Sequence, residues 1–115
     1  MSSNKQTIEK YMQGFRTGNH SMILECLTDK VTWDIPGAFH ITGKEAFDKE
    51  IENENFTGLP DIEVLRMVEE NNVVIAEGSV KCQMKNGQLL DALFCDIFEM
   101  EEGKIKYLRS YLVNK

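Results

Sequence analysis

The sequence predicts an α+β domain with helices gathered on one face of an antiparallel sheet. Apolar residues recur at helical spacing in the first third of the chain, and alternating apolar runs separated by turn signals fill the second half. The 115 residues, 42% of them hydrophobic, predict one domain spanning 1–115 with a core of its own. A net charge of −6 argues against nucleic-acid binding, which needs a basic face, and no apolar run approaches the length of a membrane span.

The first helix is predicted from four apolar residues that share one stripe. Ile8, Tyr11, Met12 and Phe15 recur at positions i, i+3, i+4 and i+7. Gly18 follows directly and is a natural residue to end a helix, because it adopts a left-handed conformation without steric cost.

Two shorter helices and a strand are expected next. Asn19 can cap a second helix whose apolar side includes Met22 and Ile23. Val31–Ile35 is typical of a short strand, stopped by Pro36-Gly37. Thr42–Glu45 has the spacing of a capping box, in which two side chains satisfy backbone N–H groups at a helix start. A third helix is therefore expected from this point.

Four longer strands are expected in the second half of the chain. They are Ile62–Val68, Val73–Met84, Leu89–Met100 and Ile105–Val113. Asn86-Gly87, between the second and third of them, is typical of a tight hairpin turn because both residues tolerate a positive φ. The sequence thus predicts a meander of antiparallel strands.

The strand from Leu89 to Met100 has two apolar faces. One face carries Ala92, Phe94, Asp96 and Phe98, and the other carries Leu93, Cys95 and Ile97. One face of an antiparallel sheet of this size should meet water. The second apolar face therefore predicts a homodimer built through the outer face of the sheet.

Asp96 is the most informative polar residue, because it lies between Phe94 and Phe98 on one face of its strand. A buried carboxylate must pair, accept hydrogen bonds or stay protonated. An ion pair with Arg109 on the next strand, or a locally exposed strand, would satisfy it. The alternative is a carboxylic acid with a raised pKa that faces a pocket.

Tyr11 and Asp34 are weaker candidates when each is taken alone. Tyr11 lies on the apolar stripe of the first helix and could be an ordinary core tyrosine. Asp34 precedes Pro36-Gly37 and could simply stabilise that turn through its side chain.

Several other kinds of site are disfavoured by the sequence. His20 and His40 have no partners at metal-ligand spacing. The three cysteines show no zinc-binding or disulfide pattern, and no apolar leader opens the chain, so reduced thiols in a cytoplasmic protein are expected. The cysteines are Cys26, Cys82 and Cys95.

Three segments resemble the NTF2-like superfamily, which includes ketosteroid isomerase and SnoaL-like polyketide cyclases. The segments are Tyr11–Asn19, Asp29–Glu45 and Cys95–Ile105. They resemble the parts of the isomerase that carry its catalytic tyrosine, its proton-shuttling aspartate and its protonated aspartate. The resemblance implies a cone-shaped, curved antiparallel sheet packed on three N-terminal helices.

The resemblance also implies a cofactor-free enzyme that moves a proton through an enolate of a hydrophobic carbonyl compound. Asp34 would be the base, and Tyr11 and neutral Asp96 would donate hydrogen bonds to the enolate oxygen. No metal or organic cofactor is needed for this chemistry. The residues expected to contact the substrate are Phe15, Trp33, Phe94, Phe98 and Arg109.

Two alternatives to this isomerase function remain open. A SnoaL-like cyclase or hydratase would use Asp34 or Asp96 as its acid/base group. A non-catalytic module would bind a hydrophobic small molecule without turnover. The fold alone does not choose among these functions.

Overall fold

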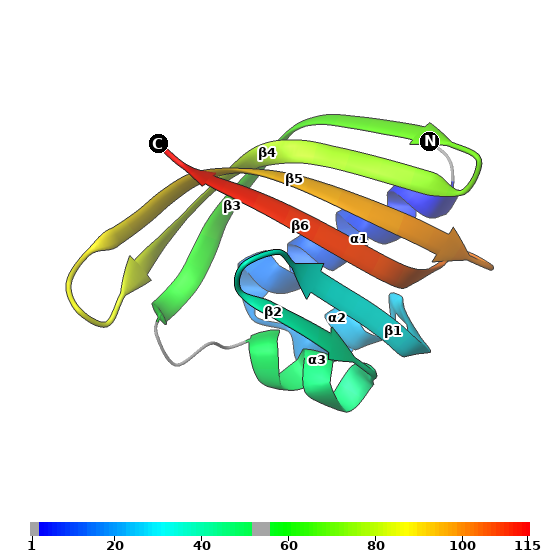
Figure 1. Cartoon of the computed structure of the whole chain (residues 1–115), viewed down its shortest axis with the longest axis horizontal. Coiled ribbons are helices and arrows are strands. Elements are labelled where there is room, and N and C mark those ends of the chain that lie inside the picture. The colour runs from blue at the N-terminus through cyan, green and yellow to red at the C-terminus, as the bar shows by residue number, and fades with distance from the viewer. Residues whose placement is uncertain (1–2, 52–55) are drawn as a thin grey trace.

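The computed structural model describes residues 3–51 and 56–115. Its elements are α1 (Ser3–Thr17), α2 (His20–Leu24), β1 (Leu27–Ile35), β2 (Phe39–Thr42), α3 (Lys44–Ile51), β3 (Phe56–Glu70), β4 (Val73–Met84), β5 (Leu89–Glu101) and β6 (Lys104–Asn114). The six strands of the described ranges form one curved, unclosed sheet in the order β2-β1-β6-β5-β4-β3, and the helices lie together beside it (Figure 1). The predicted α+β class is confirmed.

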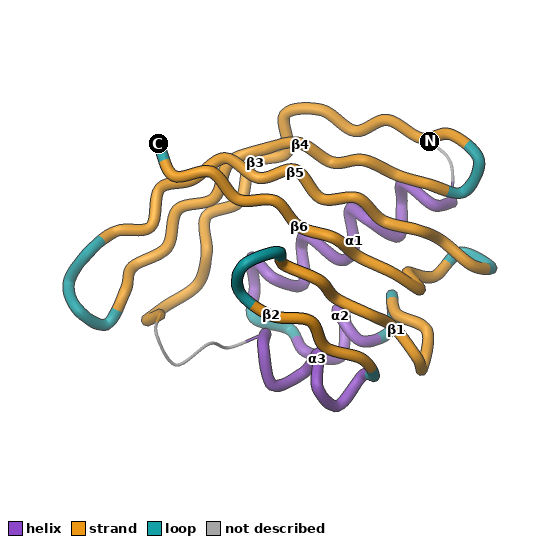
Figure 2. The backbone as a smooth tube through the Cα atoms, viewed as in Figure 1, coloured by secondary structure: helices purple, strands orange, loops and turns teal. Residues whose placement is uncertain are grey.

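One pair of strands departs from the antiparallel arrangement expected from the sequence. β1 and β6 run parallel, with Asp34 opposite Arg109 and Trp33 opposite Leu108. The other neighbouring strands in the described ranges are antiparallel. The parallel pair places an early strand beside the last one, as the tube in Figure 2 shows. Residues that are 75 positions apart in the sequence therefore come into contact.

The first helix buries three residues of the stripe that predicted it, and the fourth, Phe15, is partly buried. Ile8, Tyr11 and Met12 are each no more than 3% exposed. The helix ends at Thr17, and Gly18 follows with a φ of 65°, as its position in the sequence suggested. None of the helices found in residues 3–51 and 56–115 has the length and hydrophobicity that crossing a membrane would require.

One short strand was not predicted, and β1, like β3, begins earlier than predicted, at Leu27 instead of Val31. The turn at Pro36-Gly37 stops β1 as expected, but the chain then returns as β2, a four-residue strand that pairs with β1. β3 begins at Phe56, ahead of the predicted start at Ile62. Pro60 lies inside β3, and it is tolerated because β3 is an edge strand and the pairing register shifts between Thr57 and Asp61.

Gly78 on β4 allows the sheet to bend over the helices. A Cβ atom at this position would lie 2.1 Å from the carbonyl oxygen of Glu63 and 2.8 Å from a ring carbon of Phe94. The pairing register between β3 and β4 shifts nearby, between Val64 and Arg66. A glycine beside such a bulge lets two backbones approach closely and curves the sheet.

Candidate functional site

A cavity of about 510 Å³ opens between the helices and the curved sheet. Its walls are mostly aromatic and aliphatic, and its size lies in the range of roughly 300–1,000 Å³ that is typical of small-molecule sites. The described residues that line it are Phe15, Gly18, Trp33, Ile35, Phe39, Glu50, Ile51, Gly58, Leu59, Pro60, Ile62, Val80, Cys82 and Leu90.

Phe15 and Trp33 are the two cavity residues that the sequence had marked as ligand contacts. Their rings meet edge to face with centroids 6.2 Å apart. Trp33 is further held between Phe47, which stacks on it at 4.4 Å, and Phe39 at 5.2 Å. This packing fixes the indole ring, so the aromatic wall of the cavity is already formed without a ligand.

A buried hydrogen-bonded network lies behind this wall. The Nε1–H of Trp33 donates to Oγ of Ser110 over 3.1 Å. Ser110 stands opposite Asp96 in the pairing of β5 with β6, and the two side chains are hydrogen-bonded. Both are buried, Ser110 at 5% and Asp96 at 9% exposure. Trp33 therefore connects the cavity to a carboxyl group one layer beneath it.

Burial raises the pKa of the Asp96 carboxyl from 3.8 to about 7, and the hydrogen bond from Ser110 opposes that rise. The physical cause is the loss of hydration, which penalises the charged form. Asp96 can therefore gain or lose a proton near neutral pH, as a general acid or base must. The direction of this shift is the one that the two flanking phenylalanines suggested, but Asp96 is absent from the described lining of the cavity that it was expected to face.

Tyr11 lies in the same part of the core as Asp96. Its ring packs edge to face on Phe15 at 5.1 Å and on Phe98 at 5.4 Å. Burial, with a further contribution from the charge of Asp96, raises the pKa of the Tyr11 hydroxyl well above its ordinary value. The Tyr11 hydroxyl thus stays protonated at physiological pH, within range of the electrostatic influence of the Asp96 carboxyl group.

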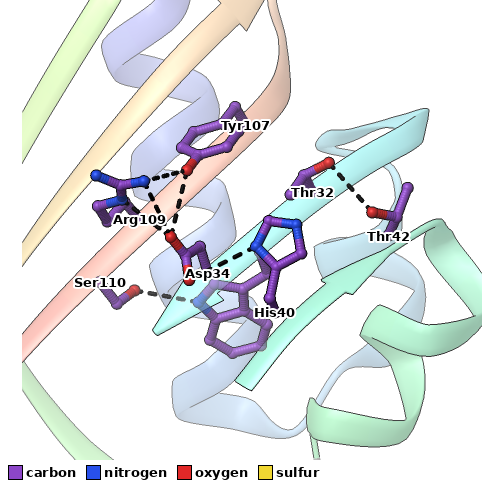
Figure 3. Close-up of polar contacts among 8 residues, drawn as sticks. Thr32, Asp34, His40, Thr42, Tyr107, Arg109 and Ser110 are labelled. Atoms are coloured by element: carbon purple, nitrogen blue, oxygen red, sulfur yellow. Dashed lines mark hydrogen bonds and ion pairs between the residues drawn. The ribbon is translucent and has the colours of Figure 1, made fainter. Parts of the chain in front are cut away.

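Asp34 does not join this pair, and the predicted arrangement is wrong at this residue. Successive residues of a strand point to opposite faces, so Asp34 faces away from the core into which Trp33 points. Its carboxylate accepts hydrogen bonds from Nε of Arg109 at 3.1 Å and from the Tyr107 hydroxyl at 3.4 Å, and it lies 3.6 Å from Nδ1 of His40 (Figure 3).

Arg109 was also predicted on the wrong side. It pairs with Asp34 on the outer face of the sheet, so neither the suggested Asp96–Arg109 bridge nor an Arg109 contact in the cavity is found. Phe94 and Phe98 are buried in the core beside Asp96 and are absent from the described lining of the cavity. The structure therefore separates the predicted residues into cavity, core and outer-face groups.

Ser110 and Glu50 are the residues that the sequence analysis missed. Ser110 follows the apolar Leu108 on one face of β6, and a polar residue on an apolar face was the available signal. Its position opposite Asp96 depends on the register in which β5 and β6 pair, and that register cannot be predicted from the sequence. Glu50 is the single charged side chain among the described residues of the cavity lining.

No cluster of three or more His, Cys, Asp or Glu side chains suited to a metal ion occurs in residues 3–51 and 56–115. The cysteines Cys26, Cys82 and Cys95 are free thiols. Cys82 lines the cavity, and burial raises its pKa, which keeps the thiol protonated.

A family model described as a SnoaL-like domain matches residues 8–108. The chain belongs to the SnoaL-like family. Among curated proteins, no sequence matches this SnoaL-like chain. Among solved structures, an NTF2-like protein from Anabaena variabilis has a TM-score of 0.84 and 24% identity over 99% of this chain and 92% of its own.

Two further structures have the same fold as this SnoaL-like protein. An LEH-like epoxide hydrolase from M. tuberculosis has a TM-score of 0.85 at 14% identity, over 96% of this chain and 83% of that one. TerC, co-crystallised with polyporic acid, has a TM-score of 0.86 at 17% identity, over 99% and 92%. At these identities the similarity establishes the NTF2-like fold.

Proposed function

We propose that the chain binds a hydrophobic, flat small molecule in the cavity beside Phe15 and Trp33. The observation that carries this proposal is the apolar cavity of about 510 Å³, whose aromatic wall is fixed by Phe39 and Phe47. A preformed wall lowers the cost of ordering side chains when a ligand binds. The co-crystallisation of TerC with polyporic acid supports small-molecule binding by this fold.

The charge of the cavity favours a neutral ligand. Glu50 places a carboxylate among apolar lining residues, and the chain as a whole carries a net charge of −6. An anionic group inside the cavity would meet a like charge in surroundings that screen it poorly. A hydroxyl or amine on the ligand could instead donate a hydrogen bond to Glu50.

A matched pair of dyes tests this proposal. N-phenyl-1-naphthylamine is neutral, and 8-anilino-1-naphthalenesulfonate has the same skeleton with an added negative charge. We expect the neutral dye to bind about tenfold more tightly, which corresponds to about 1.4 kcal/mol, in a fluorescence titration. Glu50→Gln should narrow this gap, whereas Glu45→Gln, exposed on the same helix, should leave it unchanged.

The location of binding is tested by two tryptophan substitutions at adjacent residues. Leu90 lines the cavity, so Leu90→Trp should obstruct it and weaken binding of the neutral dye. Leu89 is 57% exposed and absent from the described lining, so Leu89→Trp should bind like the wild type. Equal affinity in both variants would contradict a binding site in this cavity.

Cofactor-free proton transfer on a hydrophobic carbonyl compound is a second candidate function. The buried Asp96, with a pKa of about 7, favours it over binding alone. Because Asp34 is paired on the outer face, a two-carboxylate isomerase mechanism lacks its base. The chemistry would then rest on Asp96 as the single acid/base group, with Tyr11 as a nearby donor, as in a SnoaL-like cyclase or hydratase. Because Asp96 lies behind the cavity wall, this function requires an intervening water or a movement of Trp33 to connect Asp96 with the substrate.

We also propose that the chain forms a homodimer through the outer face of the sheet. Leu93 and Val113 lie opposite each other on β5 and β6 and are 44% and 63% exposed, and Tyr111 on the same face is 42% exposed. An exposed apolar patch of this kind favours association.

Light scattering coupled to size exclusion tests the dimer. The wild type should elute at about twice the 13.2 kDa of the chain. Leu93→Lys should shift it toward the monomer, because burying an unpaired ammonium group at an interface is costly. Leu65→Lys, on the edge strand β3, is the control and should remain dimeric. A monomeric wild type would refute the proposal.

A further inference from the structure

We infer that Ser110 is a positioning residue that couples ligand binding in the cavity to the protonation of Asp96. The inference rests on the proposed binding function and extends it to the polar network behind the cavity wall. It makes ligand affinity depend on the charge of a residue that is absent from the described cavity lining.

The hydrogen bonds give Ser110 a defined direction. An indole N–H only donates, so the Oγ atom of Ser110 must accept in its 3.1 Å contact with Trp33. The single hydroxyl proton of Ser110 is then free to point to the Asp96 carboxylate, to which it is hydrogen-bonded. This hydrogen bond stabilises the charged form of Asp96. Trp33, which holds one end of the network, is part of the cavity wall.

Asp96 is the group in this network that changes charge near neutral pH. From α1 it faces Tyr11, whose pKa is raised; from β4 it faces Ala76, and from β6 it faces Ser110. On its own strand, Cys95 also has a raised pKa, chiefly through burial. Tyrosine and cysteine with raised pKa values stay neutral between pH 5 and pH 8.

Three further acidic or basic side chains need controls. Glu50 is in the cavity lining. His20 contacts Asp48 between α2 and α3, and His40 lies beside Asp34 on the outer face. None of these contacts includes Asp96, so Glu50→Gln, His20→Gln and His40→Gln are the control variants.

The direction of the coupling follows from hydration. A ligand that fills the cavity displaces water near the network and further penalises the charged carboxylate. A neutral ligand should therefore bind more tightly when Asp96 is protonated, and by reciprocity its binding raises the pKa of Asp96. We expect the affinity for N-phenyl-1-naphthylamine, which is uncharged throughout, to fall by about tenfold between pH 5.5 and pH 8.5.

Four proteins are compared in dye titrations across this pH range. The wild type should show a midpoint near the Asp96 pKa of about 7. Asp96→Asn should bind with high affinity at every pH. Ser110→Ala removes the hydrogen bond that stabilises the carboxylate, so its midpoint should move up by about one pH unit. Ser110→Thr keeps a hydroxyl and should restore the wild-type midpoint.

A second readout needs no ligand. Trp33 is the only tryptophan of the chain, and its indole is bonded to Ser110. Its emission should titrate with the Asp96 midpoint in the wild type, shift upward in Ser110→Ala and stop titrating in Asp96→Asn. The three control variants should retain the wild-type midpoint, and circular dichroism should verify that each variant is folded.

The possible outcomes separate this inference from the binding proposal. Tight dye binding without pH dependence, or an unchanged midpoint in Ser110→Ala, would overturn the coupling and leave the binding proposal in place. Absence of dye binding at every pH would contradict the binding proposal. In that case an unshifted Trp33 titration in Ser110→Ala would overturn the role of Ser110, and an upward shift would support it.

Discussion

At pH 8.5, the Asp96→Asn variant should be more stable than the wild type by on the order of 4 kcal/mol. Folding raises the pKa of the Asp96 carboxyl from 3.8 to about 7. The native state therefore binds more protons than the unfolded state between these values, so stability falls as the pH rises through this window. At about 1.4 kcal/mol per pKa unit, the wild type loses on the order of 4 kcal/mol of folding stability above pH 7. Asparagine resembles the neutral acid and avoids that loss.

Urea unfolding at two pH values measures this difference. Near pH 5 the wild type keeps most of its Asp96 protons, so the advantage of Asp96→Asn should be smaller by about 2–3 kcal/mol than at pH 8.5. Asp61→Asn, on the exposed side of β3, is the matched control and should show no comparable dependence on pH. An advantage that is equal at both pH values would show that Asp96 does not titrate in this range.

Asp96→Asn should also abolish proton exchange if the chain is an enzyme of the second candidate type. 2-Tetralone in D₂O is a suitable neutral, flat ketone, and NMR follows deuterium entering beside its carbonyl group. A positioned acid/base group contributes typically 10²–10⁴-fold, so the variant should lose at least about 10²-fold of the exchange above buffer. Wild-type exchange should require an unobstructed cavity and thus fail in Leu90→Trp.

Asp34→Asn is the informative control for this reaction. Asp34 is paired with Arg109 on the outer face, so its substitution should leave the exchange rate within about twofold of the wild type. Loss of exchange in Asp34→Asn with retention in Asp96→Asn would contradict the assignment and restore the base predicted from the sequence. Exchange no faster than in buffer for the wild type would leave binding as the function.

The local features of the fold could be predicted because they rest on short-range chemistry. The stripe that begins at Ile8 fixes the buried face of α1. Asn86-Gly87 does lie between β4 and β5, but only Gly87 has a positive φ and the strands are joined by four residues, so the two-residue turn predicted there is wrong. β2 was missed because four residues of alternating exposure give little signal. The β1–β6 pair was missed because strand register between distant segments is set by tertiary packing.

Only part of the candidate site was predicted, because the sequence shows local patterns and does not show how distant strands pair. Asp96 and Tyr11 were identifiable as polar groups within apolar stripes, which is a local observation. The placement of Asp34 failed although a local signal existed: Val31, Trp33 and Ile35 alternate with Thr32 and Asp34 along β1. Residues that alternate in this way cannot share a face, so Trp33 in the cavity implied Asp34 outside it.

Both the proposed chemistry and the coupling of Asp96 to the cavity require that the Asp96 carboxyl group is neutral in a large fraction of molecules at physiological pH. A ¹³C NMR titration of labelled aspartate, with Asp96→Asn used to assign the resonance, measures this directly. We predict a midpoint of about 7 for Asp96, moving upward when a neutral ligand is bound. A midpoint near 4, the ordinary value for an aspartate in water, would contradict the account.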